Sequence, residues 1–117
     1  MKQVLVVDDN RAVRTALALF LEEEGFAVEV AADFEAAADR LRSGNYDVLI
    51  ADVDLPGGNG IDLVRRATAF RPEIHSILVT GYGCSAIRRR VAELGLVGYL
   101  EKPVDADTLL SLVRQSQ

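Results

Sequence analysis

Short apolar runs alternate with segments of helical periodicity along this chain, and the residues that follow those runs restrict the fold most. Five such runs occur, and four of them lead directly into an acid, a hydroxyl or an ammonium group. In an open parallel α/β sheet, the carboxyl ends of the strands share one edge, where such folds hold their ligands. The sequence therefore predicts one cleft containing three carboxylates, a hydroxyl and an ammonium. The residues concerned are Asp8, Asp9, Asp52, Thr80 and Lys102.

The order of these segments also predicts the architecture. Apolar strands separated by helices are typical of a parallel sheet that is covered on both faces. The run Ala27–Ala31 is the most polar and ends without a reactive group, so we expect it at an edge. We predict an α/β, flavodoxin-like (βα)5 doubly wound sandwich of three layers. Its five-stranded parallel sheet has the order 2-1-3-4-5, which places the other four strand ends side by side.

Polar residues mark where several helices begin. Asp33, Asn59 and Asp105 each precede an apolar-periodic segment, as N-cap residues do. Helical spacing also predicts which side chains are buried. For the helix after Asn59, the expected buried face consists of Leu63, Ala67 and Phe70.

Length and composition bound the class of protein. The 117 residues fit one domain, 1–117, without an output domain. We expect neither a membrane span nor a secretory signal, and the single cysteine, Cys84, is compatible with a reducing cytoplasm. A net charge of −5 argues against nucleic-acid binding by this domain. The basic cluster 88–90 is either a solvated helix face or a partner contact.

The predicted cleft has the chemistry of a magnesium and phosphate site. Mg²⁺ prefers a few hard oxygen ligands, which Asp8, Asp9 and Asp52 can supply with a backbone carbonyl after Asp52. A carboxylate such as Asp52 can attack phosphorus and form an aspartyl phosphate. Lys102 can neutralise the phosphoryl oxygens, and Thr80 can donate a hydrogen bond to one of them. Clustered carboxylates also repel one another, so a bound cation should relieve strain.

Each of these residues has a simpler explanation when it is taken alone. Asp9 can serve as a helix N-cap, Thr80 as a turn residue and Lys102 as a surface charge. Their joint occurrence at successive strand ends has no common structural cause. The site hypothesis is therefore much more specific than any of its members.

These motifs resemble the receiver domain of two-component response regulators along essentially the whole chain. The matching segments are 6–10, 52–60, 79–81 and 99–103. The resemblance implies that Asp52 accepts a phosphoryl group from a histidine kinase, a phosphotransfer protein or a small phosphodonor. It implies that Asp8, Asp9, Asp52 and the backbone carbonyl of Asp54 hold Mg²⁺ or Mn²⁺. It also implies that Thr80 and Lys102 bind the phosphoryl oxygens, and that the bond before Pro103 is cis.

The resemblance further implies a signalling switch rather than a conventional turnover enzyme. Phosphorylation adds about two negative charges, which should draw Thr80 inward and let Tyr99 turn. That change would repack the face made by the fourth helix, fifth strand and fifth helix, which would act on an output protein or domain. The chain would be a monomer or a phosphorylation-dependent homodimer. It would also promote its own dephosphorylation.

Two residues depart from the usual receiver pattern or add to it. Asp54 stands where receivers more often carry an apolar residue, and Tyr82 lies two residues after Thr80. Asp54 adds negative charge beside the phosphoryl site, and Tyr82 can shield the aspartyl phosphate from water. We hypothesise that this pair tunes the lifetime of the phosphoryl group. The alternative is that both are ordinary surface residues.

Two other functions fit parts of the sequence. Asp52–Leu55 is similar to the nucleophile motif of haloacid dehalogenase-type Mg-dependent phosphatases, but that family places its acidic metal motif late in the chain. Gly81–Ala86 imitates a dinucleotide-binding fingerprint, with Glu101 about 20 residues later. Almost no chain remains after it to build the second half of a cofactor cleft. We therefore favour the receiver.

Overall fold

The computed structural model describes residues 2–81, 85–96 and 98–115. Strands and helices alternate, and one short hairpin precedes the third helix. The strands are β1 (Gln3–Val7), β2 (Ala27–Ala31), β3 (Val48–Asp52), β4 (Asp54–Leu55), β5 (Gly58–Asn59), β6 (His75–Thr80) and β7 (Gly98–Glu101). The helices are α1 (Arg11–Glu23), α2 (Phe34–Ser43), α3 (Gly60–Phe70), α4 (Ser85–Glu93) and α5 (Ala106–Gln115).

The main sheet has five parallel strands in the order β2-β1-β3-β6-β7. Since β6 and β7 are its fourth and fifth strands in chain order, the predicted order 2-1-3-4-5 is confirmed. Strand β2 lies at an edge, and its side chains are less buried than those of β1 and β3. The carboxyl ends of β1, β3, β6 and β7 are therefore neighbours.

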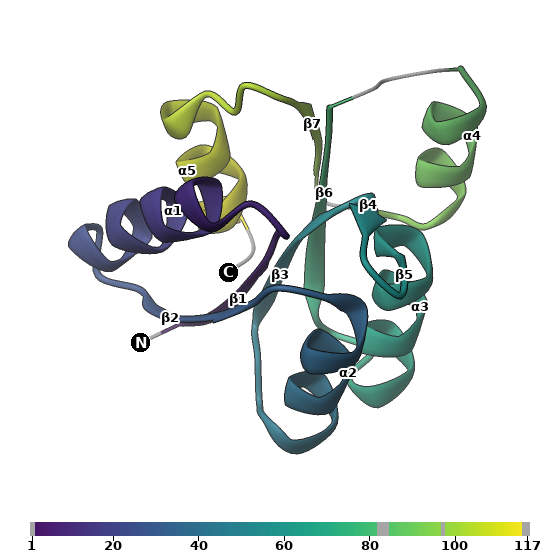
Figure 1. Ribbon diagram of the computed structural model, residues 1–117, viewed down its shortest axis with the longest axis horizontal. Helices are drawn as coiled ribbons and strands as arrows, with labels where there is room; N and C mark the ends of the chain where they lie inside the picture. Colours follow the sequence, from purple (N-terminus) through teal and green to yellow (C-terminus); the bar gives the residue numbers. More distant parts are fainter. Residues whose placement is uncertain (1, 82–84, 97, 116–117) are drawn as a thin grey trace.

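Helices cover both faces of this sheet, which gives the predicted three layers. Helices α1 and α5 lie on one face, and α2, α3 and α4 lie on the other (Figure 1). Successive side chains of a strand point to opposite faces, so each central strand contributes to two hydrophobic clusters. The cluster toward α2 and α3 includes Leu5, Val7, Leu49, Ala51 and Leu78. The cluster toward α1 and α5 includes Val4, Val6, Val48, Ile50, Ile77 and Val79.

Side-chain caps begin the helices as the sequence predicts. Asp33, Asn59 and Asp105 each accept the backbone N–H three residues further along the chain. Asn10 does the same at the start of α1. The simpler explanation of Asp9 as the cap of this helix is therefore wrong, because the neighbouring side chain holds that position.

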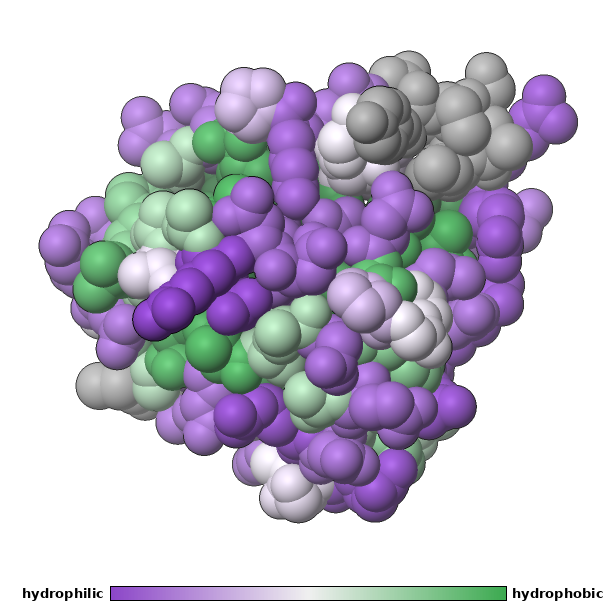
Figure 2. Space-filling model, viewed as in Figure 1, coloured by the Kyte–Doolittle hydropathy of each residue, from purple (hydrophilic) through white to green (hydrophobic). Residues whose placement is uncertain are grey.

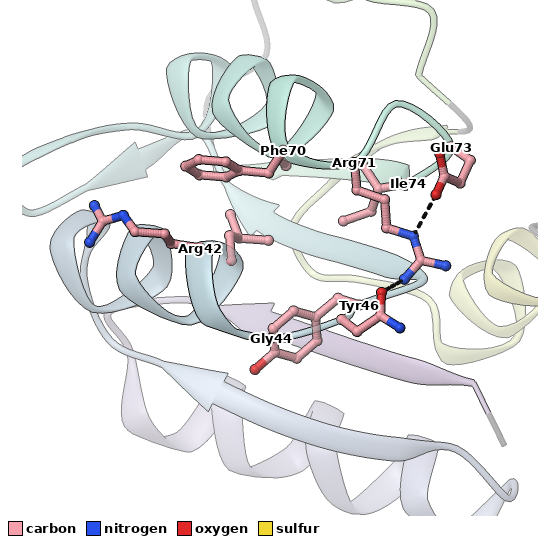
Figure 3. A pocket seen from close by; sticks show the side chains of 10 residues that line it. Arg42, Gly44, Tyr46, Phe70, Arg71, Glu73 and Ile74 are labelled. Carbon is pink, nitrogen blue, oxygen red and sulfur yellow. Dashed lines mark hydrogen bonds and ion pairs between the residues drawn. The ribbon is translucent and has the colours of Figure 1, made fainter.

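Phe70 corrects the predicted face of α3. Leu63 and Ala67 are buried as expected, but Phe70 is 50% exposed. It lies in the last turn of α3, at a hollow of about 290 Å³ between the ends of α2 and α3 (Figure 3). The last turn of α3 extends beyond the hydrophobic core. Helical spacing alone therefore predicts a buried face that is longer than the one observed.

The hollow lies at the amino ends of β3 and β6, opposite the strand ends that carry the predicted site. Arg71 borders it and pairs with Glu73 (Figure 3). It also pairs with Asn45 and Asp47. These contacts join the loop before β6 to the loop before β3. Two of the charged residues that line the hollow, Arg71 and Glu73, therefore pair with each other.

Tyr46 connects the loop before β3 to the edge strand. Its hydroxyl donates a hydrogen bond to Glu29 of β2, and Arg40 lies 3.5 Å from the same carboxylate. Burial, followed by the hydrogen bond and charge of Glu29, raises the pKa of Tyr46 to about 12. The folded state therefore favours the neutral phenol.

Among the described helices, none is long and apolar enough to cross a bilayer. The longest, α1, has 13 residues, whereas a span needs roughly 20.

We predict that Tyr46 stays protonated above pH 10, where an ordinary tyrosine ionises. Because its folded pKa is raised, its contribution to stability is complete below pH 10 and is lost as the pH rises toward about 12. The measurement is the alkaline ultraviolet titration of the wild type minus that of Tyr46→Phe. A difference curve centred near pH 10 would contradict the buried hydrogen bond.

Candidate functional site

Three carboxylates converge at the carboxyl edge of the sheet. Asp8 follows β1, Asp9 is the next residue, and Asp52 ends β3. One carboxylate oxygen of each lies within 4.8 Å of the others. Asp8 and Asp52 are only 3% and 6% exposed, whereas Asp9 is exposed. Within the described parts of the chain, no other group of three acidic, histidine or cysteine side chains meets in this way.

Lys102 brings a positive charge into the cluster from the loop after β7. Its Nζ lies 2.7 Å from Asp52 Oδ2 and 3.0 Å from Asp8 Oδ2. Burial by itself lowers the pKa of Lys102, but hydrogen bonds and attraction from Asp52 and Asp8 outweigh this effect, so the pKa is raised. The ammonium thus bridges two buried carboxylates that are 44 residues apart in the sequence.

The loop after β1 fixes Asp8 from several directions. The backbone N–H of Asn10 donates to Asp8 Oδ1 at 2.8 Å, and Arg14 Nη1 donates to the backbone carbonyl of Asp8 at 2.8 Å. On the neighbouring edge strand, the carbonyl of Ala31 accepts the backbone N–H of Asp8. This role of Arg14 is not predicted above from the sequence, although a basic residue in the first turns of a helix that starts beside two acids is a usable signal.

The loop after β3 completes the hydrogen bonds of Asp52. The backbone N–H of Asp54 donates to Asp52 Oδ1 at 3.0 Å, while Lys102 occupies Oδ2. Gly60 lies against the backbone of Asp52, because a Cβ at this position would be 2.3 Å from the Asp52 carbonyl oxygen. Only glycine allows α3 to begin this close to the end of β3.

Thr80 and Tyr99 lie on the adjoining strands β6 and β7. Thr80 is fully buried, and its carbonyl accepts the backbone N–H of Lys102 at 2.8 Å. Tyr99 is half-buried, is paired in register with Leu78, and packs against the cluster under α2 and α3. The peptide bond between Lys102 and Pro103 is cis, in the form that the resemblance implies.

A sequence model described as the response regulator receiver domain matches residues 4–114, which include every strand end described above. The chain belongs to the response regulator receiver domain family. The resemblance and the fold class inferred from the sequence are thus confirmed. Nothing in the comparisons supports the dehalogenase-type phosphatase.

Individual relatives of this receiver domain agree with the assignment. It is 31% identical to the transcriptional regulatory protein FixJ of Bradyrhizobium diazoefficiens over 113 residues, which are 97% of this chain and 55% of FixJ. The chain therefore spans little more than half the length of this curated relative.

Solved structures agree equally well. A CheY-like receiver domain protein from Methanospirillum hungatei JF-1 gives a TM-score of 0.93 at 30% identity, covering 98% of this chain and 92% of that one. The response regulator TrrA from Thermotoga maritima, solved in complex with Mg(2+)-BeF, gives a TM-score of 0.88 at 32% identity. The alignment covers 100% of each chain.

The structure thus brings together Asp8, Asp9, Asp52 and Lys102 of the predicted site residues. The side chain of Asp54 is exposed and lies outside the carboxylate cluster. Tyr82 lies outside the described residues, as does Cys84. The roles of Thr80, Tyr99 and Asp54 in the receiver domain remain predictions from the sequence.

We predict that Lys102→Met destabilises the metal-free receiver domain, because it leaves two buried carboxylates without their cation. The expected loss in the free energy of unfolding is on the order of 1–3 kcal/mol at neutral pH. Since the pKa of Lys102 is raised, its contribution is complete at neutral pH and is lost only as the pH rises through that raised value.

Urea unfolding in the presence of a chelator measures this effect. The control is Arg42→Met, which breaks only the exposed ion pair with Asp39 and should cost less than about 1 kcal/mol. Equal stability of Lys102→Met and the wild type would show that the ammonium does not hold the cluster.

Proposed function

We propose that this chain is a phosphorylation-activated signalling switch that accepts a phosphoryl group on Asp52. The observation that carries the proposal is the meeting of Asp8, Asp9 and Asp52 beside the ammonium of Lys102. The phosphodonor would be a histidine kinase or a phosphotransfer protein. We place the switch in the cytoplasm, in keeping with the single cysteine of the sequence.

The carboxylates fit a hard divalent cation such as Mg²⁺ or Mn²⁺, because their oxygens already lie within 4.8 Å of one another. Asp8, Asp9, Asp52 and the backbone carbonyl of Asp54 would hold it. When bound, the cation would offset negative charge on the phosphoryl oxygens. Its positive charge would also reduce the repulsion among the three acids, which a single lysine only partly balances.

Asp52 would act as the nucleophile. One of its carboxylate oxygens attacks phosphorus, a new P–O bond forms, and the P–N bond to the donor histidine breaks with its electron pair going to the imidazole. Lys102 would then pair with a phosphoryl oxygen, and the hydroxyl of Thr80 would donate a hydrogen bond to another. The N–H of Asp54, already bonded to Asp52, would hold the carboxylate in orientation.

An apolar groove beside the site offers a docking surface for the phosphodonor. It has a volume of about 500 Å³, and Figure 2 shows hydrophobic residues gathered on the side of α1 and α5. Docking there would deliver the donor histidine next to Lys102. The groove is lined by Val13, Ala16, Leu17, Lys102, Pro103 and Val104.

Thr80 and Tyr99 would transmit the effect of phosphorylation from the site to the surface of the domain. Movement of the Thr80 hydroxyl toward the phosphoryl group would vacate space for the Tyr99 ring and repack the face made by α4, β7 and α5. That face would act on an output protein or domain, with the chain as a monomer or as a phosphorylation-dependent homodimer. Residues 1–117 would form the receiver unit of this system.

We predict that acetyl phosphate with Mg²⁺ adds one phosphoryl group per chain. Asp52→Asn should abolish the addition, because the amide is not a nucleophile toward phosphorus. The matched control is Asp54→Asn, whose exposed side chain lies two residues away and which should still be labelled. Intact mass spectrometry measures the modification, and equal labelling of Asp52→Asn and the wild type would exclude Asp52 as the acceptor.

We also predict that Asp54 and Tyr82 set the rate at which the domain loses its phosphoryl group. Asp54→Met should slow hydrolysis several-fold, because the exposed carboxylate can accept a hydrogen bond from the attacking water. Tyr82→Ala should accelerate it by removing a shield. Release of inorganic phosphate from the purified phosphoprotein gives both rates, and unchanged rates in both variants would remove this hypothesis.

For the aromatic relay, we predict that Tyr99→Ala reduces the effect of phosphorylation on partner binding. Phosphorylation should change the partner's Kd by roughly 5–150-fold, corresponding to a coupling of ~1–3 kcal/mol. Leu100→Ala is the matched control, because Leu100 packs on the opposite face of the sheet. Full phosphorylation dependence in Tyr99→Ala would show that the signal takes another route.

A further inference from the structure

The aromatic ring of Phe34 packs on the turn of the hairpin that follows Asp52. Phe34 begins α2 and is only 5% exposed. Its backbone N–H donates to the carbonyl of Pro56 at 3.1 Å. A Cβ built on Gly58 would lie 2.6 Å from the Phe34 Cδ2 atom, so the backbone of the turn lies directly against the ring. The turn is therefore held both by a hydrogen bond and by packing.

A third element, α3, also contacts the Phe34 ring. The guanidinium carbon of Arg66, on α3, lies 5.0 Å from the centre of the Phe34 ring. A cation at this distance from an aromatic face is attracted to it. Phe34 thus joins α2, the hairpin turn and α3 at one point.

The same hairpin carries the group that orients Asp52. Asp54 pairs with Asn59 and Leu55 with Gly58, so the position of the turn fixes the position of Asp54. The N–H of Asp54 donates to Asp52 Oδ1. From Gly58, the path to the carboxylate of Asp52 therefore runs through the strand pair with Leu55, the next residue Asp54 and the hydrogen bond from the Asp54 N–H.

We propose that Phe34 is a positioning residue for the phosphoacceptor site. Its ring and backbone N–H hold the 56–58 turn, and the turn holds the Asp54 peptide with its N–H on Asp52 and its carbonyl available to the cation. This inference rests on the proposed function. It adds a residue from α2, outside the strand ends that carry the chemistry.

Phe34 also belongs to the hydrophobic core, so a loss of general stability has to be separated from a loss of positioning. Leu41 provides the control, because it lies on the same helix, is 6% exposed and belongs to the same cluster. It is at the other end of α2, away from the hairpin. Leu41→Ala should reduce stability without affecting the Asp54 peptide.

The test uses Phe34→Ala, Gly58→Ala and the double variant, with Phe34→Leu as a conservative replacement. The first readout is hydrogen exchange of the Asp54 amide in the metal-free protein, which should lose protection in both single variants. The second is the Mg²⁺ Kd from calorimetry. We expect it to rise roughly tenfold in Phe34→Ala, the lower end of the range for groups that support metal ligands.

The double variant tests the contact itself. The three atoms nearest to a Cβ on Gly58 all belong to the Phe34 ring, so adding Gly58→Ala to Phe34→Ala should cost little further Mg²⁺ affinity. Phe34→Leu should retain part of the Mg²⁺ affinity that Phe34→Ala loses. Additive losses, or equal Mg²⁺ Kd values in Phe34→Ala and Leu41→Ala, would overturn the inference. A wild type that neither binds Mg²⁺ nor accepts a phosphoryl group would instead overturn the proposed function, and this inference with it.

Discussion

The ammonium of Lys102 between Asp8 and Asp52 is the interaction on which the carboxyl edge of this molecule depends. Two carboxylates buried this deeply would repel each other without a cation between them. The bridge joins the end of β3 to the loops that follow β1 and β7, so it also fixes how the strand ends face one another. The single positive charge of Lys102 cannot balance the negative charges of three acids. The remaining negative charge favours the binding of a divalent cation.

Backbone groups of the surrounding loops also orient the two buried carboxylates. The N–H groups of Asn10 and Asp54 each donate to a buried carboxylate, and the carbonyl of Thr80 accepts the N–H of Lys102. The positions of the acids and of Lys102 therefore depend on the conformations of these loops. The hairpin after β3 therefore helps to orient the carboxylate that precedes it, and a contact such as that of Phe34 with the hairpin can affect that orientation indirectly.

The sequence predicts those parts of the structure that depend on local pattern. Strand order, the caps Asp33, Asn59 and Asp105 and the convergence of the acids all follow from periodicity and from the position of polar residues at strand ends. The hairpin β4–β5 was not predicted, because its two-residue strands leave no periodic signal. Arg14 was missed since its contact depends on how α1 lies over the loop. Phe70 was placed wrongly because helical spacing does not show where the core ends.

The free energy of unfolding, measured as a function of Mg²⁺ concentration in the wild type and in Asp9→Asn, tests whether these acids form a cation site. Asp9 is exposed, so its replacement should remove a cation ligand without disturbing the core. We expect Mg²⁺ to stabilise the wild type by RT ln(1 + [Mg²⁺]/Kd) and Asp9→Asn to lose most of this gain. A wild type whose stability does not respond to Mg²⁺ would contradict a cation site at this edge of the sheet.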